Sequence, residues 1–415
     1  MSNPLHRLRW EEKVAVPGKE ADHAGRTAAA PARPTKHRRH VENAAAKSRR
    51  NAAQSESRCR TALVLGGGAP NMALMAGALA GLHDRGVTFD VVSCSGAGSL
   101  AGLLWLAPKE ATPAEALRSV TTMSVADAIY SRFPVNYKVF QKPGSLADLW
   151  RQAMAANPFF ALNAKDYEQS SAYALAVDSM LLWAATLSPS GLHAGSWGLC
   201  QPTPFVEQII DFARIKHIKP YFYLNAYNAS KEIIDDFTKE EITLEHFHAA
   251  LAFPFIYGPY RLNGDLYYEG AVVDCLNFKD LVEKHTGLET IVVFDVLGSD
   301  SLIRAPRNLY DSWVLSMIVP LVKTAEDNLE LFALKHNKGW RRADGARTDL
   351  LKIKFDIPDE YLAEVLDWSA SNAKRLFDIG YKSGLSFYAA NADKLGARRS
   401  PTDRGAPVRG PGRGG

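Results

Sequence analysis

Apolar residues in this chain occur in short unbroken runs and in longer stretches where they recur every three or four positions. The runs at residues 61–67 (TALVLGG) and 89–95 (FDVVSCS) are typical of buried strands, and each is followed at once by a segment of helical character, residues 71–86 and 96–107. Three more strands and two long amphipathic helices are expected at residues 220–229, 290–298 and 349–357, and at residues 309–337 and 358–395. This alternation predicts a three-layer α/β/α fold with a mainly parallel central sheet.

One region departs from the alternation. Residues 127–204 are rich in helical segments, including the apolar stretch AYALAVDSMLLWAATL, but show no regular strand signal. We predict a helix-rich cap or insertion at one edge of the sheet. Its apolar segments are expected either to pack as core helices or to line a channel for acyl chains.

Charge divides the chain into three parts. The formal net charge is +4, yet residues 1–60 hold 14 Lys and Arg against 6 Asp and Glu, and residues 391–415 hold 6 against 2. Both ends are also poor in large apolar residues, so we predict disordered basic tails at 1–58 and 396–415 around one folded domain at 59–395. Such tails are either simply solvated or attract the acidic body to anionic membrane or lipid surfaces, and no nucleic acid partner is expected.

Targeting signals and cofactor motifs are not evident in the sequence. The first 60 residues contain no apolar core of a signal peptide, and the most apolar segment, residues 172–187, is too short to span a bilayer. The four cysteines are scattered without CxxC spacing, which disfavours a metal site and a disulfide framework. We therefore expect a cytoplasmic protein, peripheral to membranes or lipid inclusions, that needs no metal or cofactor.

Ser95 is the candidate nucleophile. It ends the second apolar run and precedes a helix rich in small residues, which is the setting of a nucleophile elbow. The elbow pattern is G-x-S-x-G, whereas this chain has Ser93-Cys94-Ser95-Gly96-Ala97, so small residues replace both glycines. An ordinary small-residue turn between strand and helix is the alternative.

Three consecutive glycines, Gly66, Gly67 and Gly68, follow the first strand. Neighbouring parallel strands end at the same sheet edge, so this loop and Ser95 are expected to converge there. Their amides suit an oxyanion hole better than a phosphate cradle, because the chain lacks the last glycine of G-x-G-x-x-G and the Gly-Lys-Ser/Thr of a P-loop. Nucleotide binding is therefore not expected.

With these elements placed, residues 60–390 resemble the patatin-like phospholipases. The resemblance rests on the block from Leu63 to Trp105, on LEHFHAALAFPFIYGP and on LYYEGAVVDCLNF. It implies an acyl hydrolase with a serine–aspartate dyad and no catalytic histidine. Carried over by position, Ser95 is the nucleophile, Gly66 to Gly68 supply the oxyanion donors, and Glu269 stands where the family has aspartate.

Glu269 is the most consequential departure from the family pattern. Glutamate keeps the carboxylate but adds a methylene, about 1.5 Å of reach. Asp265 and Asp274 are nearby substitutes, although Asp265 lies in a predicted turn and Asp274 matches a non-catalytic family position. The alternative is an inactive enzyme in which the Glu269 side chain faces solvent.

Histidine-dependent catalysis is a further alternative. The order Ser95, Asp295, His336 is that of α/β-hydrolase triads, but the glycine loop of those enzymes lies several strands before the serine. His336 is predicted near a helix end, and His246 and His248 alternate with apolar positions as in a packed helix.

Two functions therefore follow from the sequence. The first is a serine acyl hydrolase that cleaves carboxylic esters of lipids or another acyl-ester substrate through Ser95, Glu269 and the glycine loop. The second is a catalytically weak or inactive patatin-fold protein that binds lipid or lipid-storage surfaces.

Overall fold

The computed structural model describes residues 60–68, 72–158, 167, 170–203, 205–294, 305–306, 309–334, 345–355, 357 and 367–395. All described residues lie within the unit Ala52–Gly415. Both predicted tails lie outside the described residues, so their disorder stays a prediction.

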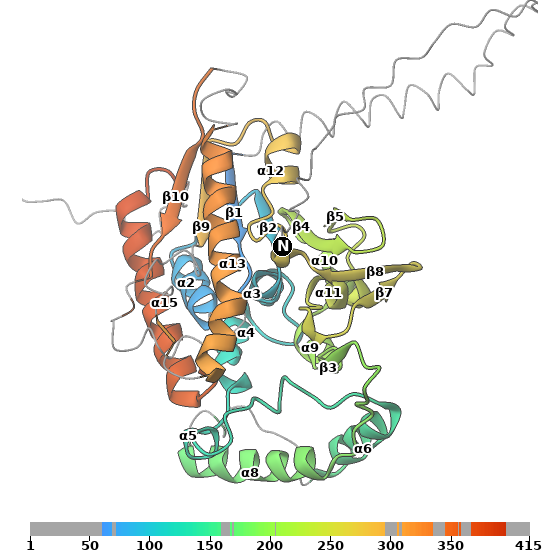
Figure 1. Ribbon diagram of the computed structural model, residues 1–415. Coiled ribbons are helices and arrows are strands. Elements are labelled where there is room, and N and C mark those ends of the chain that lie inside the picture. The colour runs from blue at the N-terminus through green and yellow to red at the C-terminus, as the bar shows by residue number, and fades with distance from the viewer. Residues whose placement is uncertain are drawn as a thin grey trace, which may run out of the picture. The chain divides into compact units, whose positions relative to one another are not determined.

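Five parallel strands form the centre of the sheet, as the apolar runs predicted. Their spatial order is β10-β9-β1-β2-β4 (Figure 1). Their bounds are β1 Thr61–Leu65, β2 Val91–Cys94, β4 Tyr221–Asn228, β9 Thr290–Phe294 and β10 Asp349–Ile353. Residues 62–65 and all of β2 and β9 are buried, which explains why these strands are apolar without alternation.

An antiparallel extension continues the sheet beyond β4. The strands β5 (Ile233–Thr238) and β8 (Asp265–Glu269) both pair with β4, and β7 (Tyr260–Leu262) pairs with β8. Between β7 and β8 the turn is made by Asn263 and Gly264, both with positive φ. The extension ends at Glu269, the residue that stands where the family has aspartate.

Helices cover both faces of the sheet, which confirms the three-layer prediction. One face carries α2 (Met72–Asp84), α3 (Ala97–Leu106), α4 (Pro113–Arg118) and α15 (Ala370–Asn391). The other carries α12 (Lys279–Lys284) and α13 (Leu309–Phe332) (Figure 1).

A helical cap with a small core of its own follows η1 (Ser119–Met123) along the chain and ends near β3 (Gly198–Cys200). The strand β3 pairs with β6 (Phe255–Tyr257). Its helices are α5 (Asp127–Tyr130), α6 (Ser145–Ala155) and α8 (Ser171–Leu187). Three short helices, α9 (Val206–Ile209), α10 (Phe212–Ile215) and α11 (Leu244–Ala250), follow. Inside the cap, the buried carboxylate of Asp178 accepts from the Ala126 amide and pairs with Lys138 at 2.7 Å. Among the described helices, none is both long and apolar enough to cross a membrane.

Candidate active site

The glycine loop and the serine turn meet at one edge of the sheet. Strands β1 and β2 are parallel neighbours, with Leu65 opposite Cys94. The Ser95 amide donates to the Leu65 carbonyl at 3.0 Å, so the two turns stay in contact just beyond the last paired residues. This convergence was expected from the sequence.

The strained residue of the turn is Gly96. It has φ 49° and ψ −129° and is the N-cap of α3. L side chains rarely adopt this conformation, and a nucleophile elbow uses such a turn to present its central side chain. The strain therefore lies one residue after the serine that the sequence analysis selected.

Gly98 fixes the register of the motif. A Cβ atom at this position would lie 2.2 Å from the Leu65 carbonyl oxygen and 2.6 Å from that of Gly66. Only glycine fits so close to the backbone of β1, which is the role of the second glycine in G-x-S-x-G. The pattern is then Cys94-Ser95-Gly96-Ala97-Gly98, with Gly96 at the serine position. This register differs by one residue from the pattern centred on Ser95 that was expected from the sequence, and Gly98 is the residue that distinguishes the two.

The Ser95 hydroxyl makes its hydrogen bond elsewhere. The side chain is fully buried, and Oγ donates to the main-chain carbonyl of Asp274 at 3.0 Å. The Asn225 amide donates to the same carbonyl at 2.9 Å. No hydrogen bond between described residues joins Ser95 to Glu269, so the role of Ser95 as nucleophile stays a prediction.

Glu269 lies against the strained turn. It ends β8, is 7% exposed, and its Oε1 lies only 2.0 Å from the place where a Cβ atom on Gly96 would be. The carboxyl group thus fills the space that a side chain at position 96 would need. Burial raises the pKa of Glu269 to about 8, because the ionised carboxylate is disfavoured away from water.

The glycine loop is closely covered by the segment that follows Glu269. The Gly67 amide donates to the Cys275 carbonyl at 3.4 Å. A Cβ atom on Gly67 would lie 2.7 Å from that of Ala271, and one on Gly66 would lie 2.9 Å from Leu276. The glycines therefore permit close backbone packing here. An oxyanion role for Gly66, Gly67 and Gly68 stays a prediction.

The other candidate acids and the histidines of α11 have structural partners. Asp274 accepts the Asn277 amide at 2.9 Å, and Asp265 pairs with Lys231 at 2.6 Å. His246 lies 2.9 Å from the Thr243 hydroxyl, and His248 lies 3.3 Å from the Thr203 carbonyl.

The alternative triad cannot be placed, since Asp295 and His336 lie outside the described residues. Within the described part of the chain, no cluster of three or more His, Cys, Asp or Glu side chains could hold a metal ion. The expectation that the protein needs no cofactor stays a prediction.

A strand–turn–helix junction at the end of a parallel sheet, beside a glycine loop, places the chain in the class of three-layer α/β proteins. The model of one family, Patatin-like phospholipase, matches residues 63–282, more than half of the chain. The chain belongs to this family of lipid acyl hydrolases, which confirms the resemblance drawn from the sequence.

Other comparisons add little. The crystal structure of VipD from Legionella pneumophila is similar at 13% sequence identity and a TM-score of 0.36, over 80% of this chain and 67% of that chain. No curated protein matches this sequence.

Proposed function

We propose that this chain is a lipid-binding member of its family that does not hydrolyse esters through Ser95 at neutral pH. The observation that carries the proposal is the contact between Gly96 and Glu269. The strained position of the elbow has no side chain, and a buried carboxyl group occupies the space where one would project.

The protonation of this site also argues against a working dyad. Direct general-base catalysis needs an ionised carboxylate in contact with the hydroxyl that it deprotonates. Here the Ser95 hydroxyl donates to a carbonyl oxygen, which is a much weaker base than a carboxylate. Glu269, with a pKa of about 8, holds its proton in most molecules at pH 7.

The second candidate is a serine acyl hydrolase that cleaves lipid carboxylic esters with Ser95 as nucleophile, Glu269 as base and the glycine loop as oxyanion hole. Family membership favours it, and so does the position of Glu269 beside the residue that follows Ser95. It requires the hydroxyl to leave the Asp274 carbonyl and Glu269 to ionise.

A fluorophosphonate probe separates the two candidates, because it labels only a serine activated as a nucleophile. We expect no labelling of the full chain at pH 7 under conditions that label a serine esterase added to the same tube. Labelling that disappears in Ser95→Ala would establish the hydrolase and overturn the proposal. Labelling that persists in Ser95→Ala would point to another serine and overturn the hydrolase built on Ser95.

Two further proposals rest on the sequence. The basic tails draw the protein to anionic membrane or lipid surfaces, since they carry a net positive charge on a body of net negative charge. A cytoplasmic site of action, peripheral to such surfaces, is proposed with them.

A further inference from the structure

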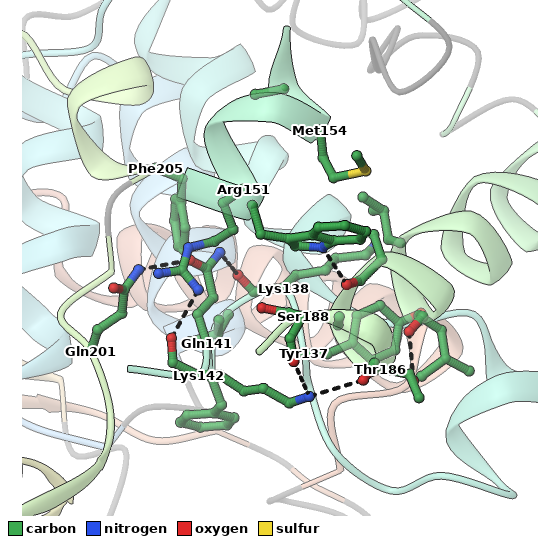
Figure 2. A pocket seen from close by; sticks show the side chains of 18 of the residues that line it. Tyr137, Lys138, Gln141, Lys142, Arg151, Met154, Thr186, Ser188, Gln201 and Phe205 are labelled. Carbon is green, nitrogen blue, oxygen red and sulfur yellow. Dashed lines mark hydrogen bonds between the residues drawn. The ribbon is translucent and has the colours of Figure 1, made fainter. Parts of the chain in front are cut away.

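A cavity of about 810 Å³ is lined mainly by residues of the cap (Figure 2). Its walls come from α6, α8, the segment 133–142 and the side chains of Gln201, Phe205 and Gln208. None of the described lining residues belongs to the glycine loop, to the turn at Gly96 or to β8. The volume lies within the usual range of small-molecule sites, about 300–1,000 Å³. The cavity is therefore a separate candidate site.

Apolar side chains form most of its wall. They include Phe133, Val135, Phe140, Trp150, Met154 and Leu181. The indole N–H of Trp150, on α6, donates to the Ala184 carbonyl on α8 at 2.8 Å, so the two helices are joined at the wall. Such a surface suits a hydrocarbon chain, which gains free energy in proportion to the apolar area removed from water.

Two of the three basic side chains at the wall are matched by carboxylates. Lys138 pairs with the buried Asp178 at 2.7 Å, and Arg151 pairs with Asp148 at 2.5 Å. Their charges are balanced inside the protein.

Lys142 is different. Its Nζ donates to the carbonyls of Thr186 and Ser188, at 3.0 and 2.9 Å, and among the described residues no acidic group forms an ion pair with it (Figure 2). An ammonium group has three donors, and these carbonyls use two. The remaining donor and the unbalanced positive charge suit an anionic head group at this end of the cavity.

The same two helices are apolar on their outer sides. Large exposed side chains are Leu146 and Leu149 on α6 and Trp183 and Leu187 on α8. The one charged residue of α8, Asp178, is buried, so the exposed side of this helix is uncharged. Contact with a lipid surface would bring the cavity next to a source of acyl chains.

We propose that the cap cavity binds a long-chain fatty acid as its carboxylate, with the hydrocarbon chain on the apolar wall and the carboxylate at Lys142. The site uses no residue of the elbow, so it stands or falls independently of Ser95 and Glu269. It also differs from an ester substrate site, because its head-group partner is a cation.

The test is displacement of dansyl-undecanoic acid from the full-length protein by saturated fatty acids and by 1-hexadecanol. Affinity should rise about fourfold for each added methylene until the cavity is filled. Palmitate should bind more tightly than 1-hexadecanol, which has the same chain length without the charge. Equal affinities for the two, or no displacement at all, would overturn the proposal.

Variants locate the ligand. Lys142→Gln should weaken the binding of palmitate about tenfold and leave the binding of 1-hexadecanol unchanged. The control Lys216→Gln, on the surface, should change the affinity for neither ligand. An equal loss for both ligands would mean that Lys142 acts through the fold and would refute its role.

Filling the cavity tests the chain-binding part. Ala185→Phe, on the cavity side of α8, should abolish binding of both ligands, whereas Ala176→Phe on the exposed side of the same helix should not. Met154→Trp, on α6, should also abolish binding of both ligands and serves as the second variant if Ala185→Phe folds poorly. Full binding by both filled variants, with unchanged circular dichroism, would place the ligand elsewhere and refute the proposal.

Discussion

Gly96 and Glu269 share one space at the elbow. With the pattern aligned on Gly98, the central position carries no side chain. The carboxyl group of Glu269 fills the space that a side chain there would need, with Oε1 2.0 Å from the Cβ position of residue 96.

Gly96→Ser should therefore destabilise the protein strongly. It adds a side chain at φ 49° and overlaps Glu269, and we expect a loss of about 3 kcal/mol in the free energy of unfolding, measured with urea. Gly86→Ser is the matched control, since Gly86 has φ 69° but open space around its Cβ position, and should cost about 1 kcal/mol.

A double variant, Gly96→Ser with Glu269→Asp, tests whether the two residues share one space. Glu269→Asp withdraws the carboxyl group, so the double variant should be more stable than the sum of the two single effects by about 1 kcal/mol or more. Additive effects would show that Gly96 and Glu269 do not share one space.

The pKa of Glu269 makes stability depend on pH. In the folded chain it is about 8 against an ordinary value of 4.5. Between these values the folded state keeps a proton that the unfolded state releases, so this group lowers stability as pH rises, by about 1.4 kcal/mol per pH unit.

Glu269→Gln removes that dependence. Relative to the parent, the variant should gain stability steadily from pH 5 to pH 8 and level off above pH 8. Urea unfolding at each pH measures the difference between the two proteins, in which the contributions of other titrating groups cancel. A difference that stays constant over this range would show that Glu269 is ionised in the fold.

At the level of elements, glycines decide how α2 and α15 pack. Cβ atoms on Gly77 and Gly380 would each lie 2.1 Å from a carbonyl oxygen of the opposite helix, Phe377 and Leu74 respectively. The two helices therefore touch through their backbones. This contact joins a helix near the N-terminal end of the folded region to one near its C-terminal end.

Gly380→Ala should thus destabilise the protein by about 2–3 kcal/mol, although alanine is the better helix former by about 1 kcal/mol. Ser386→Ala, on the exposed side of α15, measures helix propensity alone and should be neutral or slightly stabilising. A stabilised Gly380→Ala variant, seen as a higher melting temperature, would contradict the close packing of the two helices.

The parallel core could be predicted from the sequence because strands such as β1 and β9, buried on both faces, are necessarily apolar runs. The antiparallel extension was missed, since β5 and β8 are half-buried and carry polar residues such as Asp235 and Asp265. The motif register was also missed, because a motif centred on Ser95 satisfies composition equally well. Only the 2.2 Å approach at Gly98 shows which glycine the fold requires.

At the level of the whole molecule, charge and apolar surface are separated along the chain. The terminal segments carry a net positive charge and the part between them a net negative one, while the exposed apolar side chains include Trp183 and Leu187 on α8. Electrostatic attraction acts over about 10 Å at 0.1 M salt, whereas burial of apolar surface needs contact. Tails and cap should therefore contribute to membrane binding in different ways.

Vesicle binding can separate the two contributions. Removal of residues 1–58 and 396–415 should leave the melting temperature unchanged, weaken binding to phosphatidylserine vesicles, and abolish the salt dependence of what remains. Trp183→Ala in the full chain should instead weaken binding to anionic and neutral vesicles alike and preserve the salt dependence, because an exposed indole contributes through insertion at the interface. Trp105→Phe, at a buried position of α3, is the control for loss of a tryptophan without loss of exposed surface.

If the truncated chain aggregates, the terminal segments belong to the fold and the domain bounds at residues 59 and 395 are wrong. If truncation leaves binding and its salt dependence intact, the attraction arises from the folded body, despite its net negative charge, and the role proposed for the tails fails.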